Sequence, residues 1–349
     1  RPPGGLNSPT DGLASSPPGW EGTISAVPTK LLSKFTLVPT VALQRKLALL
    51  LLVSQGGITV TGSIVRVTGS GLGCSTWPNC QEGSLVPVEG AAPAVHQAIE
   101  FGNRLLTFVL IAFVVAVYVA VRAAHRRREI IMHALIQGLG IVAQAVIGGI
   151  SVWLQLAWWS VALHFLPSML LVWLAAILYL RIGEPDDAVP ARTYSSGLRL
   201  LGAVFAAGIA LVLTTGTLVT GAGQHSGDAA VGEDSRLQVP LELIAHVHAW
   251  VLYASLAILV VLVVLLRRSG APATVQKTGW ALVGIIVVQA LVGIAQFRLG
   301  VPRWSIPIHV CLSSVIVAVA SLLYAQGWAR PALDQDPRHT TGSPSGDSM

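Results

Sequence analysis

Charged residues are scarce in this sequence, at 11% of its 349 residues, whereas hydrophobic residues make up 53%. The mean hydropathy is +0.69. So little polar side-chain surface cannot cover a soluble domain of this length, which excludes that class and indicates a chain that folds in lipid. None of the apolar stretches resembles a cleaved signal peptide. The net charge of +6 is attributed to membrane topology and anionic lipid, so no nucleic-acid partner is predicted.

Apolar stretches of about 20 residues recur along the chain, the length that an α-helix needs to cross a hydrocarbon core of roughly 30 Å. Eight membrane spans are predicted, near Leu47–Val65, Ala92–Val121, Ile130–Trp153, Trp159–Leu180, Leu200–Thr220, Leu241–Leu266, Gly279–Phe297 and Ile306–Tyr324. The sequence therefore predicts an all-α membrane protein. Residues 1–40 and 331–349, rich in Pro, Gly, Ser, Thr and Asp, are predicted to be disordered tails.

The orientation of the spans follows from the basic residues in the loops. Ten Lys and Arg residues lie in the loops after the second, fourth and sixth spans, against four in the alternate loops. Because basic loops stay in the cytoplasm, both tails are predicted to be cytoplasmic in a multi-pass protein of the cell membrane.

Two stretches of the chain repeat at a fixed distance. QAVIG at 144–148 begins 20 residues before His164, and QALVG at 289–293 begins 20 residues before His309, which gives an offset of 145. TGSIV at 61–65 and TGTLV at 215–219 are also similar, at an offset of 154. We predict two parallel four-helix bundles related by a pseudo-two-fold axis, over 41–184 and 185–330.

Three histidines lie in the first turns of even-numbered spans, toward the outer face: His164, His248 and His309. An ionisable residue inside a membrane usually faces the bundle interior and has a partner. Two imidazoles from facing helices are a common way for a bundle to hold haem iron, so His248 and His309 are predicted to be haem ligands. The alternative is a buried imidazole that hydrogen-bonds a carbonyl or lines a wet cavity. His246 is predicted either to pack against neighbouring side chains or to support a ligand from behind.

The second span carries a polar face made of Glu100, Asn103 and Arg104. Asn103 occupies the position that corresponds to His248 at the offset of 145. One reading is an intrahelical ion pair that neutralises both charges. In the other, Arg104 holds a haem propionate, and Glu100 shuttles a proton or fixes water near the substrate. His96 lies two helical turns closer to the outer surface and is a candidate substitute ligand.

Cys74 and Cys80 flank Trp77 and Pro78 in the first outer loop. An oxidising compartment and a short loop predict a disulfide, either a structural staple or a redox-active pair. Metal binding is less favoured, because the loop offers neither a histidine nor a second cysteine pair.

Taken together, these motifs resemble the haem A synthase family. The most specific are GSIVRVTGSGLGCSTWPNC at 62–80 and EFGNRLL at 100–106, and weaker matches are LHFLPS, HVHAW and IHVCLSS around the three histidines. The resemblance implies that a ring methyl of haem O is oxidised to a formyl group by successive hydroxylations, giving haem A for cytochrome oxidase. It also implies a cofactor haem b on His248 and His309 and a substrate haem near His164.

The resemblance implies a proton-handling role for Glu100, and haem O synthase or assembly factors of cytochrome oxidase as partners, besides haem O and membrane lipid. It is compatible with an oligomer and does not identify the electron acceptor. The family usually has a histidine where this chain has Asn103, so the substrate haem is expected on His164 alone, with His96, or beside the asparagine amide. The alternatives are a di-haem electron-transfer cytochrome and a non-enzymatic haem carrier.

Overall fold

A computed structural model describes residues 38–225 and 236–331. Within this part, the elements are α1 (Val41–Val67), α2 (Ala94–Ala123), α3 (Arg128–Trp153), α4 (Trp158–Ile182), β1 (Ala191–Arg192), α5 (Ser196–Ala222), α6 (Leu241–Arg268), α7 (Ala273–Arg298), α8 (Ser305–Ala325) and β2 (Trp328–Ala329). All eight helices are long and apolar enough to cross a membrane, which confirms the predicted spans. The predicted disordered tails lie almost wholly outside the described residues.

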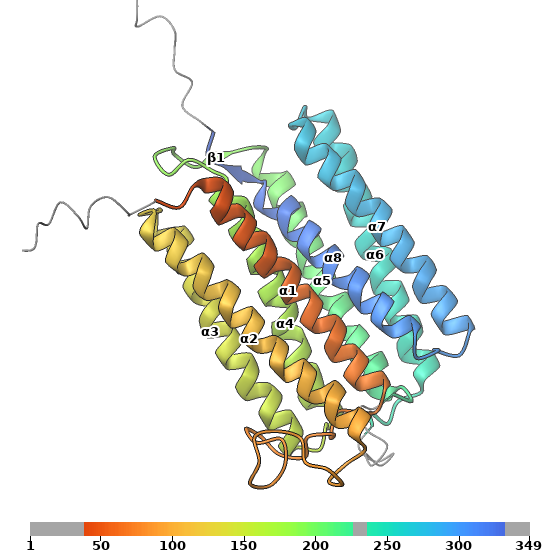
Figure 1. Ribbon diagram of the computed structural model, residues 1–349. Helices are drawn as coiled ribbons and strands as arrows, with labels where there is room; N and C mark the ends of the chain where they lie inside the picture. The colour runs from red at the N-terminus through yellow and green to blue at the C-terminus, as the bar shows by residue number, and fades with distance from the viewer. Residues whose placement is uncertain (1–37, 226–235, 332–349) are drawn as a thin grey trace, which may run out of the picture. The chain divides into compact units, whose positions relative to one another are not determined.

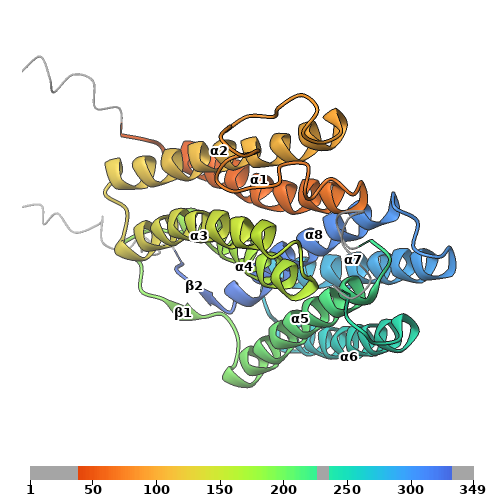
Figure 2. The ribbon, with the colours of Figure 1, turned by 90° about the horizontal axis from the view of Figure 1, so that it is seen from below.

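The helices contact one another in two groups of four. Around the first group, α1 contacts α2, α2 contacts α3, α3 contacts α4 and α4 contacts α1. The second group repeats this cycle with α5 to α8, and the groups meet through the pairs α1–α8, α4–α8 and α4–α5 (Figures 1 and 2). Exchanging the two groups leaves this set of pairs unchanged. The contacts therefore agree with the predicted pseudo-two-fold relation, which stays a prediction.

The repeat extends to the backbone of the turns. The helices α3 and α7 begin 145 residues apart and also end 145 residues apart. The turn before α3 has His125 at φ 49°, and the turn before α7 has Gly270 at φ 69°. The turns that follow them are equivalent too, with Gln155 at φ 49° and Gly300 at φ 73°. The same left-handed positions therefore close both hairpins, although the first half uses side chains that rarely adopt this conformation.

Apolar side chains fill the inside of each group and also cover its outside. The first core includes Leu51 and Leu178, and the second includes Leu259 and Ile286. On the outside, side chains such as Phe108 are exposed. A bundle that is apolar all round is expected where the surrounding solvent is lipid.

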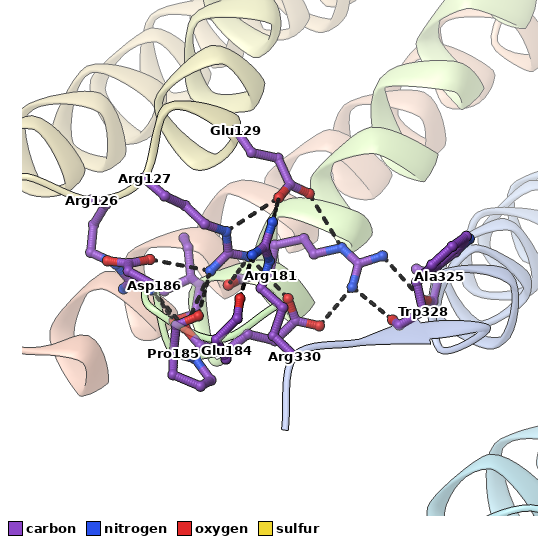
Figure 3. A network of polar contacts seen from close by, with 12 residues as sticks. Arg126, Arg127, Glu129, Arg181, Glu184, Pro185, Asp186, Ala325, Trp328 and Arg330 are labelled. Atoms are coloured by element: carbon purple, nitrogen blue, oxygen red, sulfur yellow. Dashed lines mark hydrogen bonds and ion pairs between the residues drawn. The ribbon is translucent and has the colours of Figure 1, made fainter. Parts of the chain in front are cut away.

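An ionic network ties together the end of the bundle where α4 ends and α3 begins (Figure 3). Arg127 contacts Glu184 at 2.9 Å, and Arg181 contacts the same carboxylate at 2.6 Å. Arg330, beyond β2, approaches Glu129 of α3 at 3.5 Å. The antiparallel pairing of β1 with β2 joins the same regions. The segment between the halves and the end of the described chain are thus held against the first group.

Asp186 belongs to this network outside the membrane spans. Burial alone would raise the pKa of its carboxyl group, but a hydrogen bond from Arg126 and the charges of Arg126 and Arg127 outweigh burial and lower it. Arg126 lies 2.7 Å from Asp186 and also donates to Gln44 Oε1 at 2.9 Å. Because the folded state stabilises the ionised form, Asp186 contributes stability above its unfolded pKa, and this contribution is lost as the pH falls through the lower folded pKa.

Candidate haem site

Two predicted haem ligands come together in the second group of helices. The ring centroids of His248, from α6, and His309, from α8, lie 6.4 Å apart, with 52° between the ring planes. Two imidazoles that each bind one metal ion from about 2 Å, with ring centres about 1 Å behind the ligating nitrogens, have centroids about 6 Å apart. The observed separation therefore fits a metal ion held between the rings.

Thr215 of α5 lies within hydrogen-bond distance of the ring of His248. Its Oγ1 lies 3.0 Å from the carbonyl oxygens of both Leu211 and Val212, to which its single hydrogen is donated. The same hydroxyl lies 3.1 Å from Nδ1 of His248 and therefore accepts a hydrogen bond from the ring. The proton is thereby assigned to Nδ1, which leaves the lone pair of Nε2 free for a metal.

Glycines allow close packing behind both rings. A Cβ on Gly216 would lie 3.2 Å from Cε1 of His248, and one on Gly293 would lie 3.4 Å from Cε1 of His309. Ser313 and Gln289 donate to the main-chain carbonyl of His309 at 2.8 and 3.0 Å. Nδ1 of His309 is buried without a hydrogen-bond partner among the described residues. An imidazole oriented by packing, with no competing polar partner, fits a role as a metal ligand.

The structure places His246 differently from His248. Its Nδ1 lies 2.7 Å from the carbonyl oxygen of Glu242, and its ring packs against Phe297 at 5.8 Å. These contacts agree with the predicted packing role.

His164 of α4 repeats the environment of His309. A Cβ on Gly148 would lie 3.0 Å from Cε1 of His164, and Ser168 donates to the carbonyl of His164 at 2.9 Å. Its Nδ1 is likewise buried without a partner in the described part of the chain. In the same half, Thr61 donates to Oδ1 of Asn103 at 2.6 Å. Thr61 and Asn103 correspond to Thr215 and His248, so an amide occupies the place of one imidazole.

Glu100 and Arg104 form the ion pair that one reading of the sequence predicted. Arg104 Nη2 lies 2.7 Å from Oε1 of Glu100, and the side chain of Glu100 is only 7% exposed. The other carboxylate oxygen accepts from the backbone N–H of Cys74 at 2.6 Å. Arg104 also donates to the carbonyls of Cys74, Thr76 and Asn79 at 3.0 to 3.1 Å. The pair therefore fastens the cysteine loop to α2, and the role of Arg104 toward a haem propionate stays a prediction.

The predicted disulfide joins Cys74 and Cys80. Between them, Trp77 packs edge-on against Trp153, with 5.8 Å between ring centroids. A Cβ on Gly149 would collide with the ring of Trp77. Because Gly148 contacts His164 and Gly149 contacts Trp77, the cysteine loop lies next to the His164 site.

His96 lies at the start of α2 and is half-buried. Its carbonyl oxygen lies 2.5 Å from a Cβ placed on Gly73, so its backbone supports the base of the cysteine loop. The predicted role of His96 as a substitute ligand stays a prediction. Among the residues that the structure describes, no group of three or more His, Cys, Asp or Glu side chains is arranged to hold a metal ion. The candidate centre is therefore a pair of imidazoles.

The chain matches one family model, and the curated proteins similar to it are named heme A synthase. A family model described as cytochrome oxidase assembly protein, COX15-CtaA, matches residues 45–321. A heme A synthase of Geobacillus kaustophilus is 30% identical over 142 residues, which cover 40% of this chain and 43% of the relative. A heme A synthase of Lysinibacillus sphaericus is 31% identical over 201 residues, covering 56% and 63%. One from Listeria monocytogenes is 33% identical over 163 residues, covering 45% and 52%. The matches thus span about half the length of these relatives.

Proposed function

The chain belongs to the COX15-CtaA family of cytochrome oxidase assembly proteins, and from this premise we propose that it is a haem A synthase. In this proposal one ring methyl of haem O is hydroxylated twice, the resulting hydrate loses water to give a formyl group, and the electrons removed from the substrate pass to an external acceptor, so the chain acts as an oxidoreductase. The observation that carries the proposal is the pair His248 and His309, whose ring centroids lie 6.4 Å apart. The pair supports a resident haem b in the second half, which leaves the first half for the substrate.

Haem b between these histidines would supply the electron transfer that side chains cannot. The chain contributes the binding and orientation of both haems. Thr215 keeps Nε2 of His248 available as a ligand. Gly216 and Gly293 let the two rings be backed by the main chain. In the first half, His164 would hold haem O in an environment equivalent to that of His309.

Glu100 is the proposed proton-handling residue of the substrate half. Its carboxylate is buried and accepts hydrogen bonds from Arg104 and from the backbone of Cys74. These two contacts fix the position of the carboxylate, and a carboxyl group can take up and release a proton. The loop closed by the disulfide would limit the access of water to this region, because Trp77 packs on Gly149 beside the His164 site.

The proposal places both haem sites toward the extracytoplasmic face of the cell membrane and both termini in the cytoplasm. Basic loops support this orientation, because Arg126, Arg127 and Arg181 lie together in the network of Figure 3. Haem O synthase or an assembly factor of cytochrome oxidase is the proposed type of partner, since haem O is poorly soluble and would pass between membrane proteins.

A haem inventory tests the proposal. The full chain would be purified from cells that make haem O, and its haems would be extracted and separated by chromatography. Haem b together with haem O and haem A is the expected result. Haem b alone would favour an electron-transfer cytochrome and contradict the synthase. The variant His246→Ala is the control, because that ring packs against Phe297 and should leave the inventory unchanged.

A further inference from the structure

We propose that Asn103 leaves the axial position opposite His164 without a protein ligand, so that the first half binds a haem through one imidazole and admits a small exogenous ligand at the iron. This inference rests on the proposed function, because it concerns the haem of the first half. It assigns this half a binding site for small neutral or anionic iron ligands, with the amide of Asn103 as a hydrogen-bond donor.

The surroundings of Asn103 and His164 in the first half match those of His248 and His309 in the second. Thr61 contacts Asn103 at 2.6 Å, as Thr215 contacts His248 at 3.1 Å. On the facing helix, Gly148 backs His164 as Gly293 backs His309. The serines four residues later donate to the histidine carbonyls in both halves, at 2.9 and 2.8 Å. Asn103 therefore stands where the second half places a ligand.

The side-chain amide of Asn103 is a poor ligand for iron. Oδ1 of Asn103 accepts a hydrogen bond from Thr61. The amide nitrogen has no lone pair to offer a metal, because it is a donor group only. Iron in proteins is held by imidazole, thiolate, thioether, phenolate or carboxylate groups. Asn103 is therefore a poor axial ligand, and the end of its side chain that Thr61 does not engage is a hydrogen-bond donor.

The first half has room for a ligand beside Gly62 that the second half does not have beside Gly216. In the second half, a Cβ on Gly216 would meet the ring of His248 at 3.2 Å. In the first half, the corresponding residue is Gly62, and a Cβ placed there would have no atom within 4 Å among the described residues. The space directly beside this glycine, which an imidazole fills in one half, is thus open in the other. A diatomic ligand is smaller than the missing ring.

Carbon monoxide is the probe for this site, because it binds ferrous haem iron that has a free axial position and is excluded by two imidazoles. The purified full chain would be loaded with iron protoporphyrin IX to two haems, reduced, and titrated with carbon monoxide. One carbon monoxide per chain is expected. The variant Asn103→His should become low-spin at both haems and lose carbon monoxide binding at least tenfold.

The reciprocal variant His248→Asn should bind a second carbon monoxide, because it gives the second half the ligands of the first. His246→Ala is the control outside the site, because that ring packs against Phe297, and it should retain one carbon monoxide per chain. Two haems without carbon monoxide binding in the unaltered protein would overturn the inference and leave the proposed function standing. Carbon monoxide binding that appears only in His96→Ala would also overturn it, by showing that His96 is the second ligand. A chain that binds no haem would instead contradict the proposed function.

Discussion

The two halves of the molecule have the same residues around the histidine of the fourth helix but differ in the residue that faces this histidine. Both have a threonine on the first helix, a glycine behind the histidine of the fourth helix, and a serine that donates to that histidine's carbonyl. At the third-helix glycine and the fourth-helix histidine the halves are alike, but Asn103 replaces the imidazole of His248. The halves therefore share these contacts and differ in the residues that we propose as haem ligands, as expected if one haem stays and the other is turned over.

Charge separates the halves as well. Glu100 and Arg104 correspond to Ala245 and Ala249 at the offset of 145, so the buried ion pair belongs to the first half alone. The position equivalent to Gly149 is Ile294, which is 46% exposed. An isoleucine there has the Cβ that the packing of Trp77 on Gly149 excludes. The first half thus combines a covering loop with a carboxylate, which are features of a reaction site.

The largest effect is expected for Glu100→Gln. Glutamine keeps a carbonyl that accepts from the backbone of Cys74 but cannot take up a proton, so conversion of haem O should fall at least about 100-fold while both haems stay bound. Turnover would be followed by chromatography of the haems. Free-thiol titration is the control that the disulfide loop is intact. Turnover equal to that of the unaltered protein would refute the proton-handling role and remove the main chemical difference between the halves.

A second comparison uses the paired threonines. Thr215→Val removes the acceptor that orients His248, which should weaken the binding of haem b about 10- to 100-fold, the range seen when partners of metal-bound histidines are lost. Thr61→Val should leave haem b affinity unchanged, because its partner is Asn103. Haem titration of both variants measures the difference. Equal losses in the two variants would contradict the division of roles.

The smallest effect concerns the ionic network of the first half. Asp186→Asn should lower the free energy of unfolding by up to about 1 kcal/mol at neutral pH, because the pair with Arg126 is partly solvated. The deficit should shrink as the pH falls from the unfolded pKa of an aspartate through the lower folded pKa of Asp186, where the unaltered carboxylate also becomes protonated. Thermal unfolding in detergent across this pH range measures it. A deficit that stays constant with pH would show that the charge of Asp186 is not its cause.

Much of this arrangement could be predicted from the sequence, because long apolar runs and a repeat of 145 residues leave few folds open. The helix ends were less predictable. The helix α1 begins at Val41 and not near Leu47, since Thr40 caps it and the polar residues between continue the helix past the apolar run. The disulfide was predicted from two cysteines in a short loop, and the structure confirms it.

The contacts of the cysteine loop could not be predicted. Arg104 donates to main-chain carbonyls. Because every residue has such a carbonyl, no pattern of side chains in the sequence predicts these hydrogen bonds. The packing of Trp77 on Gly149 joins residues far apart in the sequence. The repeated TG motif contains Thr61 and Thr215, so the sequence marked these two residues. It could not show that they contact Asn103 and His248, because these partners lie on the neighbouring helix.

We propose that His248 and His309 hold one haem between them. The optical spectrum of the reduced, purified protein tests it most directly when His248→Ala and His309→Ala are each compared with His246→Ala. The low-spin spectrum of the resident haem should disappear in the first two variants and persist in the third. A low-spin spectrum that survives the loss of either ligand would contradict it.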